Sequence, residues 1–176
     1  AAIVFTHLHW DHIQGFPFFS CGYIPHNSFT IWGEERESTG VEQLLSGQMT
    51  GDYFPIELSA MQAKLNFRSV DGPFEVGGMK IRPFRLPHPG GSLGYRVEAG
   101  NAVFILATDS EFDKIALNQE DLAKNHLARR QYSDELIEFM SGANLIVIDT
   151  QYTDAVYQQR KGWGHNSIAT VVDLCN

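Results

Sequence analysis

Four residues of the types that bind metal ions lie within six positions near the start of the chain. They are His7, His9, Asp11 and His12. In an extended backbone His7 and His9 point to the same side, so both imidazoles can reach one ion. A turn at Trp10 would let Asp11 and His12 face a second ion. The spacing therefore predicts a site for two metal ions.

Three further candidate ligands lie where one predicted element gives way to the next: His88, Asp109 and His165. Residues at strand ends can converge on one rim of a sheet, whereas ligands in mid-strand would be dispersed by the pleat. The predicted set for one ion is His7, His9 and His88, and the set for the other is Asp11, His12 and His165. Asp109 can bridge the two ions. About three protein ligands per ion leave room for water, as a catalytic site requires.

The competing interpretation is that histidines near a core are only hydrogen-bonded side chains. We apply it to His26 in its polar loop and to His126, which lies close to two arginines. For the larger set, four ligand types in six positions and three more at element ends would all have to be accidental. The metal interpretation is therefore preferred for that set.

The pattern of apolar residues predicts the elements that must position these side chains. Alternation and buried runs predict strands over residues 2–6, 29–32, 79–87, 93–99, 102–108 and 144–148. Helical spacing predicts helices over residues 41–49, 58–65, 132–140 and 168–175, with Ser133 as an N-cap and Gly142 just past the end of its helix. Strands mixed with helices indicate a layered α/β architecture.

Composition excludes several classes of protein. The chain has 176 residues, of which 43% are hydrophobic and 19% charged, as in a compact globular protein. Its net charge of −8 would repel a polyanion, so extended nucleic acid is not an expected partner. The longest uninterrupted apolar run, residues 102–107, is far shorter than the roughly 20 residues that span a bilayer, so we expect no membrane segment.

The two cysteines and the first residues bear on compartment and completeness. Cys21 and Cys175 do not make a disulfide framework, which favours a reducing, cytoplasmic setting. The chain opens at Ala1 without an initiator Met and already within a predicted strand. We therefore expect residues 1–176 to be one domain that is a fragment, with N-terminal strands and the C-terminal end missing.

The segment Thr6–His12, which reads THLHWDH, resembles the HxHxDH motif of the metallo-β-lactamase superfamily. His88, Asp109 and His165 match, in order, the later His, the bridging Asp and the last His of that superfamily. The resemblance extends over the whole chain. It implies a dinuclear metal site on a four-layer αββα sandwich that lacks its first strands.

Four further segments look like the PhnP-type branch of that superfamily, which includes phosphoribosyl cyclic phosphodiesterases and is related to tRNase Z. They are residues 16–19, 88–96, 107–111 and 162–167. His9 stands where flavo-diiron relatives have Glu, and Asp109 where the commonest β-lactamases have Cys. Residues 148–152 read IDTQY instead of carrying the His-Glu-Ala-Thr motif of the tRNA-processing branch. Neither redox chemistry, β-lactam cleavage nor tRNA processing is therefore favoured.

The function that this resemblance implies is hydrolysis of a small phosphodiester, cyclic ones included, by a hydroxide that bridges two divalent ions. Zinc is the expected metal, with Mn²⁺ or Fe²⁺ as alternatives, and Asp11 both ligates and orients the nucleophile. Tyr152 and Tyr95 are candidates for the acid that protonates the leaving oxygen. A homodimer is compatible with this activity.

Two other functions stay open at this point. The same metal site could cleave an ester, a lactone or a thioester, and no motif separates these substrates from phosphodiesters. Alternatively the fold could be a metal-stabilised binding module without catalysis. A pure binding module has no need for an open site of two metals, so a hydrolase is preferred.

Several nearby residues have both a functional and a structural interpretation. Gly90 and Gly91 could offer backbone N–H groups to a phosphate or only form a turn. Arg160 and Lys161 could neutralise an anionic substrate or complement the end of the preceding helix. The aromatic residues Trp10, Phe16, Phe18 and Phe19 could wall a pocket, although such a cluster after a strand is more often core.

Overall fold

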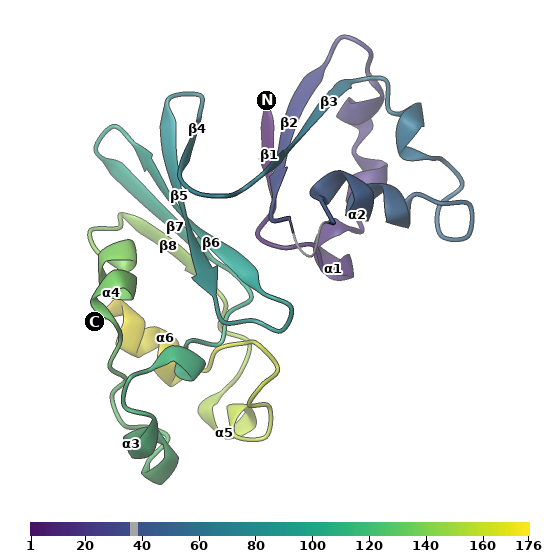
Figure 1. The fold of residues 1–176 in the computed structure, drawn as a ribbon. Helices are drawn as coiled ribbons and strands as arrows, with labels where there is room; N and C mark the ends of the chain where they lie inside the picture. Colours follow the sequence, from purple (N-terminus) through teal and green to yellow (C-terminus); the bar gives the residue numbers. More distant parts are fainter. Residues whose placement is uncertain (36–38) are drawn as a thin grey trace. The chain divides into compact units, whose positions relative to one another are not determined.

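The chain divides into two compact units, each with its own β-sheet (Figure 1). The structure is a computed structural model that describes residues 1–35 and 39–176. The first unit comprises Ala1–Gly72 and the second Pro73–Asn176. Helices and strands alternate in both, which confirms the predicted α/β class.

The first unit is built on a parallel sheet of three strands in the order β1-β2-β3. The strands are β1 (Ala2–Val4), β2 (Ser28–Gly33) and β3 (Lys64–Ser69). The helices are α1 (Trp10–Ile13) and α2 (Val41–Gln48), together with single 3-10 turns at Phe16–Phe18, Ser20–Tyr23 and Leu58–Ala60. Phe29 and Ile31 alternate along β2 on its buried face, where they join Leu45 of α2 in one apolar core.

The second unit is built on a five-stranded sheet in the order β4-β5-β6-β7-β8. Its strands are β4 (Phe74–Val76), β5 (Met79–Leu86), β6 (Ser92–Ala99), β7 (Ala102–Ala107) and β8 (Leu145–Ile148). Strands β4 to β7 form an antiparallel meander, and β8 pairs parallel with β7. A parallel pair needs a long crossover, and the segment between β7 and β8 supplies it with helices.

The helical segments of the second unit are η4 (Phe112–Ile115, a 3-10 turn), α3 (Gln119–Lys124), α4 (Asp134–Met140), α5 (Asp154–Tyr157) and α6 (Ile168–Cys175). The core of the unit joins the sheet to η4 and α4, with Ile105, Phe112 and Phe139 fully buried or nearly so. Leu174 of α6 packs against the same cluster. In Figure 1, α4 and α6 lie together beside this sheet.

The predicted strands of the second unit and the helices α2, α4 and α6 are confirmed. So are two predicted details of α4: the Ser133 hydroxyl accepts a hydrogen bond from the Leu136 N–H, and Gly142 has the positive φ (69°) of a residue that follows a helix. Cys21 and Cys175 are both free and exposed. Among the described residues, none of the helices is both long and apolar enough to cross a bilayer.

The helix predicted over residues 58–65 is wrong. Only a 3-10 turn forms at Leu58–Ala60, and Leu65 lies in β3, paired with Phe29 of β2. Three apolar residues at helical spacing are too few to exclude a strand that begins at the last of them, so pairing with β2 decides the outcome. The short helices α3 and α5 were not predicted either, because six and four residues are too few to show a period.

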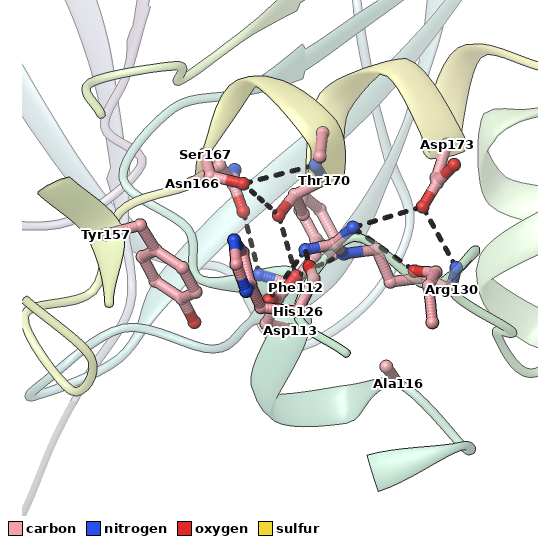
Figure 2. A network of polar contacts seen from close by, with 12 residues as sticks. Phe112, Asp113, Ala116, His126, Arg130, Tyr157, Asn166, Ser167, Thr170 and Asp173 are labelled. Atoms are coloured by element: carbon pink, nitrogen blue, oxygen red, sulfur yellow. Dashed lines mark hydrogen bonds and ion pairs between the residues drawn. The ribbon is translucent and has the colours of Figure 1, made fainter. Parts of the chain in front are cut away.

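A buried ionic network fastens η4 to α6 (Figure 2). The guanidinium of Arg130, whose side chain is 1% exposed, donates to both carboxylate oxygens of Asp113 at 2.7 and 3.1 Å. It also donates to Asp173 at 3.3 Å, while the Thr170 hydroxyl donates to Asp113 at 2.7 Å. Burial by itself would lower the pKa of Arg130, but the hydrogen bonds to Asp113 and Asp173 raise it overall, so the guanidinium stays charged.

We expect Arg130→Met to lower the free energy of unfolding by about 3 kcal/mol, because it leaves the carboxylates of Asp113 and Asp173 without their buried partner. Denaturant unfolding followed by circular dichroism measures the loss. The control is Arg82→Met, which removes a surface ion pair with Glu138 and should cost less than about 1 kcal/mol. Equal losses of unfolding free energy in the two variants would show that the buried network stabilises the chain no more than a surface ion pair does.

Candidate metal centre

The seven predicted ligands fall into two groups, one in each unit of the chain. The first unit carries His7, His9, Asp11 and His12, and the second carries His88, Asp109 and His165. Each group is described below from the elements that position it.

In the first unit, three imidazoles gather just after β1. His7 is buried, and its ring centroid lies 4.6 Å from that of His9 and 4.2 Å from that of His12. The chain turns into α1 at Trp10, as predicted, and this turn carries His12 back to His7. The Asp11 carboxylate is exposed and lies 3.5 Å from Nε2 of His12.

In the second unit, the strand directions explain why distant residues meet. β5 and β7 are both antiparallel to β6, and β8 is parallel to β7, so β5, β7 and β8 all end at the same rim of the sheet. His88 follows β5 and Asp109 follows β7. Nε2 of His88 lies 3.7 Å from Oδ2 of Asp109, and the His88 and His165 rings are 5.5 Å apart. The predicted convergence at one rim is therefore confirmed for this group.

Hydrogen bonds orient both imidazoles of the second group. Nδ1 of His88 donates to the carbonyl of Gly164 at 2.9 Å, and Nδ1 of His165 donates to Oδ2 of Asp149 at 2.7 Å. With the proton on Nδ1, the lone pair of each ring is on Nε2, the atom that can ligate an ion. Histidines that bind metals usually have such a partner on the other ring nitrogen.

Asp149 contacts a candidate ligand, and the sequence analysis did not nominate it. It follows β8 as Asp109 follows β7, and its carboxylate also accepts the Ser110 N–H at 3.3 Å. The sequence signal that could have identified Asp149 is its position directly after a predicted strand. Because a carboxylate after a strand can face many partners, only the structure shows that it holds His165.

Asp109 has a positive φ of 51°, the only such residue other than glycine in the part of the chain that the structure describes. Residues with a Cβ pay for this left-handed conformation, although Asp tolerates it better than most. Strained backbone that persists at a cluster of polar side chains is typical of functional sites. In this conformation the Asp109 carboxylate lies beside His88.

The structure shows the surroundings of the residues for which the sequence left both a functional and a structural interpretation. Phe16 is buried in the core of the first unit, whereas Trp10 is 69% and Phe18 73% exposed. Gly90 and Gly91 have positive φ, and the Gly91 N–H donates to the His88 carbonyl, which is the geometry of a tight turn. The Arg160 guanidinium lies 4.7 Å over the ring of Trp163, so it stacks in the loop that leads to residue 165.

The chain was compared with known proteins. A family model described as the beta-lactamase superfamily domain matches residues 1–176. Among solved structures, human tRNase Z, short form, is similar at a TM-score of 0.64 and 19% identity, over 99% of this chain and 68% of that one. A diphosphatase from the PhnP family is similar at a TM-score of 0.60 and 18% identity, over 99% of this chain and 55% of that one.

A third similar structure is the metallo-beta-lactamase fold protein YhfI from Bacillus subtilis, at a TM-score of 0.55 and 20% identity, over 86% of this chain and 50% of that one. The chain thus spans about half the length of YhfI and of the diphosphatase. The comparison with curated proteins finds no match. At identities this low the similarity concerns the fold alone.

Gly164 should be the least replaceable glycine beside the second ligand group. A Cβ on Gly164 would overlap Nδ1 of His88 and Cδ of Pro89, and its φ is +89°. We expect Gly164→Ala to cost at least about 2 kcal/mol of stability, from backbone strain and steric overlap together. Denaturant unfolding measures it.

The matched control is Gly162→Ala. Gly162 has a similar φ of +92°, but nothing lies within 4 Å of its added Cβ, so only the strain of about 1 kcal/mol applies. The difference in unfolding free energy between the two variants measures the cost of the steric overlap with His88 and Pro89. If Gly162→Ala proved as costly as Gly164→Ala, the approach would not matter.

Proposed function

The chain belongs to the metallo-β-lactamase superfamily, and from that premise we propose that it is a metal-dependent hydrolase that cleaves small phosphodiesters, cyclic ones included. Members of this superfamily are generally hydrolases and typically bind divalent metals. The observation that carries the proposal is the second ligand group: two imidazoles whose Nδ1 atoms each donate a hydrogen bond, one of them beside an aspartate with a positive φ. A purely structural cluster would not need this orientation.

The donor set suits a divalent cation of the zinc type. Imidazole nitrogen and carboxylate oxygen are ordinary ligands of Zn²⁺, and Mn²⁺ and Fe²⁺ accept the same atoms. In our proposal His7, His9 and His88 hold one ion, and Asp11, His12 and His165 hold the other. Asp109 would be shared between them. About three protein ligands per ion would leave room for water, which is the requirement for catalysis.

Bound divalent cations would supply Lewis acidity and would lower the pKa of a bound water to about 7. The chain's own residues would then orient the reactants. The exposed Asp11 carboxylate, beside His12, can accept a proton from the attacking water and align it. Asp149 keeps the His165 ring in place through Nδ1.

A proton must also reach the leaving oxygen. Of the two tyrosines considered for this step, Tyr95 packs against Phe74, while the ring of Tyr152 lies 6.0 Å from that of His165. Tyr152 is therefore the better-placed donor, and its hydroxyl accepts a hydrogen bond from the Gln151 amide at 3.4 Å.

Three features support a small phosphodiester as the substrate. Residue 109 is Asp, residues 148–152 lack the His-Glu-Ala-Thr motif, and the net charge of −8 disfavours an extended polyanion. Two of the similar solved structures are named as a diphosphatase and a tRNase, so their names agree with a substrate that contains phosphate.

Removal of one ligand should abolish activity without unfolding the chain. We expect His88→Ala and Asp109→Ala each to lower kcat/KM at least about 100-fold, because they take donors from an open site and not volume from the core. Kinetics, circular dichroism and elemental analysis are run on the same samples. A variant with normal turnover and normal metal content would remove that residue from the ligand set.

The unchanged chain provides the reference for metal content. After zinc supplementation and removal of loose metal, elemental analysis should find about two ions per chain, since seven donors exceed what one tetrahedral ion can use. At most one ion would contradict the dinuclear site and the bridging role of Asp109.

Substrate preference tests the reaction itself. We expect kcat/KM for bis-p-nitrophenyl phosphate and for a cyclic ribose phosphate to exceed that for a phosphomonoester, a cephalosporin and a chromogenic lactone by at least about tenfold. In a dinuclear site one side admits the nucleophile while a cation stabilises the leaving oxygen, an arrangement that suits a diester. His88→Ala serves as the background control. Faster cleavage of the lactone or the cephalosporin would overturn the phosphodiesterase assignment.

A further inference from the structure

Glu111 is a buried carboxylate that the proposed chemistry does not use. It lies two residues after Asp109, and only 1% of its surface is exposed. A buried carboxylate is costly unless its oxygens accept hydrogen bonds from well-placed donors. The donors that Glu111 has therefore indicate what it is for.

Three of those donors come from one short segment, the end of α5 and the loop that follows it. Oε1 accepts the Tyr157 hydroxyl at 3.0 Å and the Gly162 N–H at 2.7 Å, and Oε2 accepts the Gly164 N–H at 2.9 Å. The fourth partner is Lys114, whose half-exposed ammonium lies 3.1 Å from Oε2. The carboxylate thus fixes both glycines in the loop that leads from α5 to His165.

Gly164 connects this carboxylate to two candidate ligands. Its N–H donates to Glu111, its carbonyl accepts Nδ1 of His88, and His165 is the next residue. The backbone of Glu111 adds a further tie, because its own N–H donates to the carbonyl of Pro87 at 2.7 Å, directly before His88. Glu111 therefore binds the backbone next to both histidines.

We propose that Glu111 is a positioning residue that holds His88 and His165 in the orientation needed to bind a metal ion. The inference rests on the proposed function only in taking these two histidines as ligands. It assigns to Glu111 no contact with the ion, the substrate or the reacting atoms.

The charge states agree with this role. Burial, and then the negative charges of Asp113 and Glu111, raise the pKa of Tyr157 well above its ordinary value, so its hydroxyl remains a donor. Charge-assisted hydrogen bonds from N–H groups to a buried carboxylate are about twice as strong as neutral ones. The hydrogen bonds from the loop to Glu111 are consequently stronger than those to a neutral side chain would be.

The test is Glu111→Gln, probed with Zn²⁺ and Co²⁺ on the whole chain. The amide has one oxygen in place of two, so its NH₂ group must face either Gly162 or Gly164, donor against donor. We expect the affinity for Zn²⁺, measured by competition with a chromophoric chelator, to fall at least about tenfold. The visible absorption of bound Co²⁺, which reports ligand geometry, should change as well.

Glu111→Asp is a second variant for the case that Glu111→Gln folds poorly. It keeps the buried charge and its ion pair with Lys114 but withdraws the carboxylate from the loop, so it should also lose Zn²⁺ affinity. Lys114→Met is the matched control, since it removes the one partner that does not come from residues 157–164 and should leave Zn²⁺ affinity within about twofold. Arg130→Met controls for general loss of stability and should bind Zn²⁺ like the unchanged chain.

The outcomes separate the two proposals. If the unchanged chain binds no Zn²⁺, the proposed function fails. If it binds Zn²⁺ and both Glu111 variants bind equally well, the positioning role is overturned while the proposed function stands. The role is also overturned if Arg130→Met loses as much affinity, because the effect would then follow from stability alone.

Discussion

The second unit depends on a buried negative charge and the backbone N–H groups that satisfy it. The loop that leads to His165 contains Gly162 and Gly164, and glycine restricts the backbone less than any other residue. In our proposal Glu111 holds this loop in a defined position, because its carboxylate accepts the N–H groups of both glycines and would be costly to leave unpaired inside the unit. His88 and Asp109 depend on the same loop, through Gly164 and through the chain connection to Glu111.

The sheet supplies the other half of the arrangement. Because β5, β7 and β8 end at one rim, residues 88, 109 and 149 leave rigid strands within reach of one another. Asn166 strengthens this rim: its amide accepts the Phe112 N–H at 2.8 Å and donates to the Ser110 hydroxyl at 2.8 Å and the Asp149 carbonyl at 3.1 Å. Rigid strand ends joined by side-chain hydrogen bonds can hold the strained backbone of a functional residue.

Stability and positioning are divided between two networks that meet at η4. The Asp113 carboxylate accepts hydrogen bonds from Arg130 and from Thr170 of α6, as Figure 2 shows. Glu111, two residues earlier, faces the loop before His165. Residues 111–113 therefore take part in both networks. The effects of substitutions in the two networks on stability and on Zn²⁺ affinity can be compared, because both networks include residues of this segment.

The sequence by itself determined the strands from residue 79 onward and the family, and it nominated the candidate ligands, because alternation and a dense local motif are visible without tertiary contacts. It did not determine β3, whose apolar spacing also fits a helix until it pairs with β2. The sequence also did not reveal that Glu111 bonds the loop before His165 or that Asp149 bonds His165 itself. A carboxylate acquires its role from the donors that face it. Three donors to Glu111 lie 46 to 53 residues away, and the two donors to Asp149 lie 16 and 39 residues away. Only the tertiary structure decides which distant segments supply them, since no local pattern encodes that pairing.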